Sequence, residues 1–197
     1  MSSINDTYRK KYEKYGVDSR SLHWHSEKAA KQRYVQIVSD IDFSGKTILD
    51  VGCGFGDIIP YIKKESKEFE YTGVDVMPEF IEEAKKIHSE YTFLVKDYFN
   101  EPIDNKFDIV MCSGALNSNV DDNLSFRKDA IKTMYEHAQE VMVFNMAGKY
   151  PQPKTSATSN VWFADPLEIL EYCMTLTPKV ILRKHYHSRE FTIVMIR

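Results

Sequence analysis

The 197-residue sequence contains few cysteines, few glycines and prolines, and no long apolar run. Its three cysteines are widely spaced and odd in number, which excludes a disulfide framework and a cysteine-based zinc site and favours a reducing compartment. Eight glycines and seven prolines are too few for a collagen-like or low-complexity chain. No segment approaches the roughly 20 apolar residues of a membrane-spanning helix, and the N-terminal residues lack the apolar core of a signal peptide. We therefore expect a soluble, cytoplasmic protein without a metal or a membrane partner.

The charge of the chain is nearly balanced, with 26 Lys and Arg against 29 Asp and Glu and a formal net charge of −3. Proteins that grip nucleic-acid phosphates carry a basic excess, so no nucleic-acid partner is expected. Hydrophobic residues make up 43% of the chain, and its length suits one hydrophobic core. The composition therefore predicts a single globular domain.

Short segments rich in β-branched and aromatic residues alternate with segments of helical periodicity. This alternation predicts an α/β fold, namely a Rossmann-like, mostly parallel sheet of seven strands with helices on both faces. Only Ser188 and Arg189 separate the last two predicted strands, which is too short for a crossover and predicts a terminal antiparallel hairpin. The predicted strands are 47–52, 71–76, 92–97, 107–114, 141–147, 179–187 and 190–197. The predicted helices are 57–67, 78–90, 122–139 and 165–175, of which the third begins at Asp121 or Asp122 and the fourth at Asp165.

Two regions lie outside this alternation. Residues 1–44 contain apolar residues at helical spacing, and we expect one or two helices here that cap the carboxyl ends of the strands, before one compact unit at 45–197. Residues 148–160 are rich in Pro, Ser and Thr, which predicts one long loop.

The strongest chemical signal is the segment from Asp50 to Asp57, DVGCGFGD, between a predicted strand and a predicted helix. Its alternating glycines allow a tight turn and a close approach of a ligand to main-chain N–H groups. A dinucleotide site reads G-x-G-x-x-G, whereas two carboxylates flank the glycines here. They repel a pyrophosphate and tolerate a cation, so the turn favours a nucleoside with a positively charged tail.

Acidic residues end the next two predicted strands. Asp75 follows 19 residues after Gly56, where a carboxylate can accept both hydroxyls of a ribose. Asp97 is placed to accept from an adenine amino group, with Tyr98 or Phe99 beside the ring. Ser113 ends the fourth strand, where the reactive part of such a ligand lies.

The motifs DVGCGFG, GVD, KDYF and FDIVMCSG, in this order, resemble motifs I to IV of class I S-adenosylmethionine-dependent methyltransferases. The resemblance extends over about residues 45–197, because the terminal hairpin also matches that family's sheet. It implies S-adenosylmethionine as cofactor and S-adenosylhomocysteine as product. It further implies that Gly52 and Gly54 line the methionine portion, Asp75 binds the ribose, Val76 and Met77 flank the adenine, Asp97 meets its amino group, and Cys112 or Ser113 offers a carbonyl to the ammonium.

Other candidate residues come from their position in the predicted fold. Arg33 on the capping helix is a candidate partner for the cofactor carboxylate. The remaining expected cofactor-binding residues are Asp50, Cys53 and Tyr98. The catalytic residues are not identified, and His185, His187 and Tyr150 are candidates for a general base. Candidate substrate-binding residues are Trp24, Asn117, Tyr150 and Trp162, the last two on a loop that is a candidate lid.

The predicted function is methyl transfer to an oxygen or nitrogen of a small-molecule acceptor by direct in-line displacement. The fourth strand ends in CSGALN rather than the N-P-P-Y type associated with methylation of adenine or glutamine. Three alternatives remain open: a catalytically silent cofactor-binding module that serves as a partner's scaffold, an aminopropyl transferase, and a nicotinamide oxidoreductase.

Overall fold

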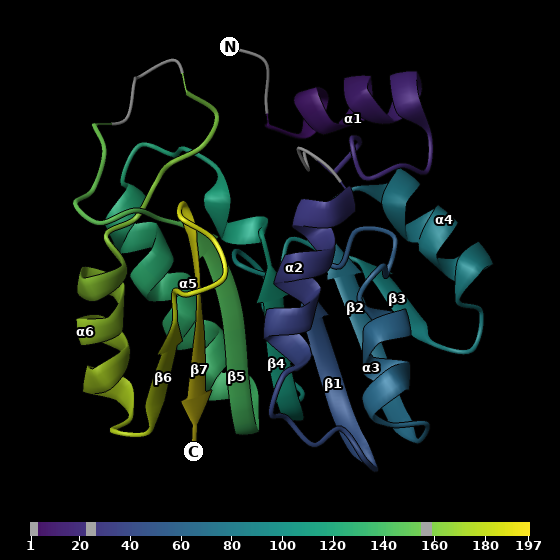
Figure 1. The fold of residues 1–197 in the computed structure, drawn as a ribbon. Coiled ribbons are helices and arrows are strands. Elements are labelled where there is room, and N and C mark those ends of the chain that lie inside the picture. Colours follow the sequence, from purple (N-terminus) through teal and green to yellow (C-terminus); the bar gives the residue numbers. More distant parts are fainter. Residues whose placement is uncertain (1–3, 23–26, 155–158) are drawn as a thin grey trace.

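The computed structural model describes residues 4–22, 27–154 and 159–197, and a seven-stranded sheet runs through its centre (Figure 1). The strands are β1 (Lys46–Val51), β2 (Phe69–Asp75), β3 (Thr92–Val95), β4 (Phe107–Ser113), β5 (Ala138–Ala147), β6 (Val180–Arg183) and β7 (Glu190–Ile196). The helices are α1 (Ile4–Tyr15), α2 (Glu27–Val38), α3 (Ile59–Glu65), α4 (Pro78–Ile87), the short 3₁₀ helix η1 (Ala115–Asn117), α5 (Asn123–His137) and α6 (Pro166–Leu176).

The strand order is β3-β2-β1-β4-β5-β7-β6. The first five strands in this order are parallel, and β7 lies antiparallel between β5 and β6. The predicted Rossmann-like α/β fold with its terminal antiparallel hairpin is therefore confirmed. The chain leaves β1 toward β2 and β3 on one side and continues to β4 and β5 on the other, which creates a topological switch point between β1 and β4.

Helices cover both faces of the sheet, and for this reason the central strands are apolar on both sides. In β4, residues 109–112 are all buried. One face packs against α2, α3 and α4, and the other packs against α5 and α6. Two helices begin where aspartates predict it, because Asp122 accepts a hydrogen bond from the N–H of Ser125 and Asp165 accepts one from the N–H of Leu167.

The two N-terminal helices have different positions. Figure 1 shows α1 lying across the carboxyl ends of β1 and β2. Tyr8 and Tyr12 of α1 pack edge-on against Phe80, and Tyr12 also contacts Phe55 in the loop after β1. By contrast, α2 packs on the sheet face against β4, β5 and β7. Helix α2 does not cap the strand ends, because its apolar residues, among them Ala30, form one core with the strands beneath them.

The last hairpin is shorter than predicted. Strand β6 ends at Arg183, so His185, Tyr186 and His187 lie in the turn 184–189 rather than on a strand. The guanidinium of Arg183 donates to the main-chain carbonyls of Gln36 and Ser39 at the end of α2. These bonds fix the end of β6 beside α2.

A buried ion pair joins α2 to the start of β7. Two guanidinium nitrogens of Arg33 donate to the two carboxylate oxygens of Glu190, and both residues are less than a tenth exposed. Such a pair is costly to bury, but removal of one partner leaves an uncompensated charge in the core.

We therefore predict that Glu190→Gln lowers the free energy of unfolding by about 3 kcal/mol, because Arg33 keeps its buried charge without a counter-ion. The double variant Arg33→Leu, Glu190→Leu should recover most of this loss. Urea unfolding measures both. The control is Glu90→Gln, which breaks the exposed pair with Lys63 and should cost less than about 1 kcal/mol. Equal losses in the two glutamine variants would contradict the prediction.

Candidate functional site

The glycine turn after β1 has a backbone that only glycine adopts easily. Gly52, Gly54 and Gly56 have φ values of 74°, 55° and 78°. A Cβ at Gly52 would lie 2.5 Å from the Cβ of Ala115, and one at Gly54 would lie 2.9 Å from the side chain of Leu22. The turn is thus a backbone-lined cradle at the switch point, as the sequence predicts.

Asp75 at the end of β2 is bonded directly to this turn. Its Oδ2 accepts a hydrogen bond from the N–H of Gly54 at 3.0 Å, and its Oδ1 accepts one from the N–H of Met77 at 3.0 Å. Burial raises the pKa of Asp75, and the hydrogen bonds from the backbone oppose this shift. The carboxylate is therefore held in one orientation, with lone pairs left on both oxygens for further donors.

Asp50 on β1 is buried beneath the turn. Its Oδ2 accepts a hydrogen bond from the hydroxyl of Tyr71 at 2.6 Å, whereas its Oδ1 has no hydrogen-bond partner among the described residues. Burial raises the pKa of Asp50 to about 7, the hydrogen bond from Tyr71 lowers it, and the charge of Asp75 raises it. A ligand cation at Oδ1 would supply the missing partner.

The segment that contains α1 lies close over this cradle. Besides the contact of Leu22 with the site of a Gly54 side chain, Tyr8 is close enough to Asp75 to sense its charge. Burial and this negative charge raise the pKa of Tyr8 to about 12. The carboxyl ends of β1 and β2 are thus covered.

The expected adenine-side residues have mixed positions. Val76 and Asp97 are exposed, and Asp97 accepts a hydrogen bond from the side chain of Asn100 within its own turn. Met77 is buried in the aromatic cluster under α1. The prediction for Tyr98 is wrong, because its ring is buried in the core and its hydroxyl bonds the Nδ1 of His137.

The two cysteines expected at the site are both buried. Cys112 on β4 lies in the core under α5, and Cys53 in the glycine turn packs in the cluster that contains Phe93, next to Gly73. Burial raises the pKa of both thiols, so they are neutral packing groups. Ser113 is half-buried, and its hydroxyl accepts a hydrogen bond from the Nδ2 of Asn145.

The loops after β4 and β5 are joined by Asn117 and a buried arginine. The Oδ1 of Asn117 accepts from the N–H of Ala147, and its carbonyl accepts from the N–H of Trp162. Arg127 donates to the carbonyls of Leu116 and Ser118 and stacks under the ring of Trp162. Trp162 is therefore an anchor of the core and not part of a lid, which corrects the prediction.

One of the two other expected substrate-binding residues lies on the surface. Tyr150 is 63% exposed. Trp24 lies outside the described residues, as do residues 155–158 of the long loop.

The two histidine candidates for a general base lie in the turn between β6 and β7. His185 is exposed, and His187 is half-buried. The Nδ1 of His187 accepts a hydrogen bond from the N–H of Arg189, so a neutral ring carries its proton on Nε2. In this arrangement neither nitrogen is free to remove a proton from an acceptor. Arg33 was expected to bind the cofactor carboxylate, but its guanidinium donates to Glu190 instead.

Sequence reasoning missed three residues of this region. Tyr71 opens a predicted strand but gives no sign that its hydroxyl reaches Asp50, and Leu22 lies in a segment without a motif. Asn145 had a readable signal, because it is the one polar residue within the apolar segment VMVFNMA.

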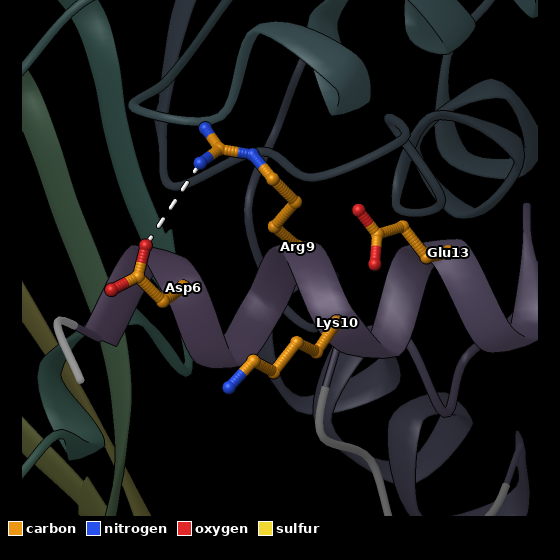
Figure 2. A pocket seen from close by; sticks show the side chains of 4 residues that line it. All are labelled: Asp6, Arg9, Lys10 and Glu13. Carbon is orange, nitrogen blue, oxygen red and sulfur yellow. Dashed lines mark ion pairs between the residues drawn. The ribbon is translucent and has the colours of Figure 1, made fainter.

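Two surface hollows lie away from the glycine turn. Figure 2 shows one on α1, lined by Asp6, Arg9, Lys10 and Glu13 and holding about 340 Å³, with a dashed ion pair between Asp6 and Arg9. Because Arg9 also donates to Glu79 on α4 at 2.8 Å, this charged face serves to dock α1. The second hollow, of about 440 Å³, lies between α2 and the turn 184–189.

The described residues contain neither a candidate metal site nor a membrane-spanning helix. No group of three or more His, Cys, Asp or Glu side chains is placed to hold a metal ion there. The helices of this part of the chain are all too short or too polar to cross a bilayer.

Comparisons with known proteins point to one family. A family described as "Methyltransferase domain" matches residues 42–175. The chain is 24% identical over 159 residues to Rv1506c of Mycobacterium tuberculosis, a provisionally named methyltransferase, with 76% of this chain and 92% of that protein covered. It is 35% identical over 95 residues to the provisionally named methyltransferase 235L of Invertebrate iridescent virus 6, with 45% of this chain covered. The aligned part spans only 36% of the viral protein.

A solved structure supports the fold. The magnesium protoporphyrin IX methyltransferase of Synechocystis PCC 6803, crystallised with bound S-adenosylhomocysteine, superposes with a TM-score of 0.67. The match covers 98% of this chain and 93% of that chain at 15% identity. The chain thus has the fold of the methyltransferases that its sequence motifs resemble.

The buried Asp50 predicts a pH-dependent stability. The pKa of an aspartate in an unfolded chain is about 4, and burial raises the pKa of Asp50 in the folded chain to about 7. The folded chain binds this proton more tightly, so its contribution favours folding below about 4 and is lost as the pH rises to about 7. Asp50→Asn should therefore gain stability relative to the parent protein between pH 5 and pH 8.

Urea unfolding at both pH values measures this gain. The control is Asp108→Asn, since hydrogen bonds from Thr47 lower the pKa of Asp108 and it stays ionised over this range. Its stability difference from the parent should not change with pH. A pH-independent difference for Asp50→Asn would contradict the burial argument.

Proposed function

This chain belongs to the methyltransferase domain family, and we propose that it transfers a methyl group from S-adenosylmethionine to an oxygen or nitrogen of a small-molecule acceptor. The observation that carries the proposal is the arrangement of three residues beside the switch point. Asp50 and Asp75 lie near the ends of the paired strands β1 and β2, and Gly54 in the turn after β1 donates its N–H to Asp75. Open parallel sheets bind their ligands at this place.

The chemistry of the residues present fits the cofactor. Asp75 has lone pairs for two ribose hydroxyls, because its backbone bonds use one acceptor position on each oxygen. The buried Oδ1 of Asp50 lacks a donor, and the ammonium of the methionine portion would supply one. The glycine turn has no side chain to obstruct the approach of that portion. Two buried carboxylates here also disfavour the pyrophosphate of a nicotinamide dinucleotide.

When bound, S-adenosylmethionine supplies a sulfonium methyl group that is already electrophilic. The protein's part is to hold the methyl group in line with the acceptor and to exclude water. Asp75 and Asp50 would orient the two ends of the cofactor, and the carbonyl of Cys112 or Ser113 at the end of β4 would accept from its ammonium. Tyr8 and Leu22 cover the cradle, so the segment that contains them would have to move outward for the cofactor to enter.

Binding of S-adenosylhomocysteine tests the assignment of Asp75. We predict that Asp75→Ala weakens it by about 10- to 100-fold, because two hydrogen bonds to a charged group are lost. Isothermal titration calorimetry measures the affinity. Asp104→Ala, which removes an exposed carboxylate from the loop before β4, is the matched control and should bind as the parent does. Unchanged affinity in Asp75→Ala would refute the ribose assignment.

Transfer of labelled methyl groups to a pool of metabolites separates the enzyme from its alternatives. Label in a small molecule supports the proposal. Binding without transfer to any metabolite would favour a silent module. Transfer of an aminopropyl group from decarboxylated S-adenosylmethionine would favour the other transferase.

A further inference from the structure

A row of polar side chains crosses the sheet on the acceptor side of the cradle. Ser113 on β4, Asn145 on β5 and Thr192 on β7 are paired in register. The residues two positions away on the same strands, Met111, Val143 and Val194, belong to the core under α2, so the row also faces α2.

The row continues into the turn 184–189. The hydroxyl of Tyr186 lies 3.0 Å from the Oγ1 of Thr192, within hydrogen-bond distance. We call Ser113, Asn145, Thr192 and Tyr186 the polar row.

Asn145 is the member of the polar row with an unsatisfied hydrogen-bond acceptor. It is 1% exposed, and its Oδ1 has no hydrogen-bond partner among the described residues. A rotated amide would only transfer the deficiency to the nitrogen, because Ser113 bonds one of the two atoms. A buried acceptor without a donor costs about 1 to 3 kcal/mol. Asn145 is two strands away from Asp50, roughly 10 Å, so one small group cannot satisfy both.

A groove of about 440 Å³ adjoins the outer end of the polar row. It lies between α2 and the turn 184–189, and Tyr186 belongs to both the groove and the row. The groove is lined by Lys28, Lys31, Gln32, Val35, Gln36 and Tyr186. Its volume is in the range of pockets for small organic molecules.

The groove carries an excess of positive charge. Lys28 and Lys31 are exposed, and no ion pair joins either of them to a described side chain. Glu27 is the one acid among residues 27–36, and the buried Glu190 is bonded to Arg33. The turn 184–189 contains Lys184 and Arg189 and no acid, whereas aspartates surround the cofactor cradle. The two sides of β4 therefore differ in local charge.

Resting on the proposed function, we propose that the methyl acceptor is a small organic anion that also bears an O–H or N–H group. Its carboxylate or phosphate binds between Lys28 and Lys31, and its O–H or N–H donates to the Oδ1 of Asn145. This assignment disfavours the aminopropyl transferase alternative, because that reaction uses a cationic amine as acceptor.

Affinities of four phenolic probes for the protein saturated with S-adenosylhomocysteine test the charge preference. The probes are 4-hydroxybenzoate, 4-hydroxyphenyl phosphate, 4-hydroxybenzamide and 4-hydroxybenzylamine, and ligand-observed NMR gives each dissociation constant. We expect at least one anion to bind about tenfold more tightly than the amide and the amine, and the better anion identifies the preferred group. Lys28→Glu with Lys31→Glu should remove this preference. Equal affinities for all four probes in the parent protein would overturn the proposal.

The control is Lys67→Glu with Lys106→Glu, which makes the same change in net charge just before the amino ends of β2 and β4. It should keep the anion preference, and its loss in this control would assign the preference to net charge. Binding of S-adenosylhomocysteine is measured first for every variant. Failure of the parent protein to bind it would reject the proposed function, whereas failure of the anion preference with this binding intact would reject only the acceptor assignment.

The role of Asn145 has a separate test in Asn145→Leu. Because the buried Oδ1 is unpartnered, this variant should fold with equal or greater stability. It should bind 4-hydroxybenzoate about tenfold more weakly than the parent and bind benzoate, which lacks the hydroxyl, as the parent does. An equal loss for both probes, or no loss for either, would contradict a direct hydrogen bond from the acceptor.

Discussion

The hydrogen bonds that Gly54 and Met77 donate to Asp75 fix the geometry on which the candidate site depends. They join the turn after β1 to the end of β2 and to the start of α4, so one carboxylate links three segments. The bonds also offset the cost of burying a carboxylate, since a charged acceptor that receives backbone N–H groups keeps its ionised form more easily. Gly54 can direct its N–H in this way because its φ is positive, which a residue with a side chain adopts only under strain.

Topology then divides the carboxyl edge of the sheet into two environments. On the side of β1 and β2, aspartates surround the glycine turn, and the aromatic cluster of α1 covers it. On the side of β5 and β7, the polar row leads into a groove with two lysines. β4 lies between them, and Ser113 at its end touches Asn145. A small nearly neutral protein thus has aspartates on one side of this strand end and an excess of lysine on the other, which its net charge of −3 does not reveal.

Sequence patterns predicted the parts of this arrangement that depend on local rules. Alternating periodicity gave the sheet and both layers, Asp122 and Asp165 marked helix starts, and the glycine spacing located the cradle. Long-range partners were out of reach. Arg33 meets Glu190 from 157 positions away, and Tyr98 turns inward because His137 offers its ring nitrogen. Trp162 resembles a lid residue in sequence and becomes an anchor only through Arg127.

Two of the three buried side-chain oxygens that lack a hydrogen-bond partner among the described residues bear on this division, and the third is Oε2 of Glu79 on α4. Asp50 and Asn145 lie on the same face of the sheet and on opposite sides of β4. Each costs folding free energy, and a core selected for stability alone would replace both. Their separation of roughly 10 Å is too large for one bridging ion or water. Two ligand groups are needed, one on each side of the strand end, and a reaction that brings a cationic donor together with a separate acceptor requires that arrangement.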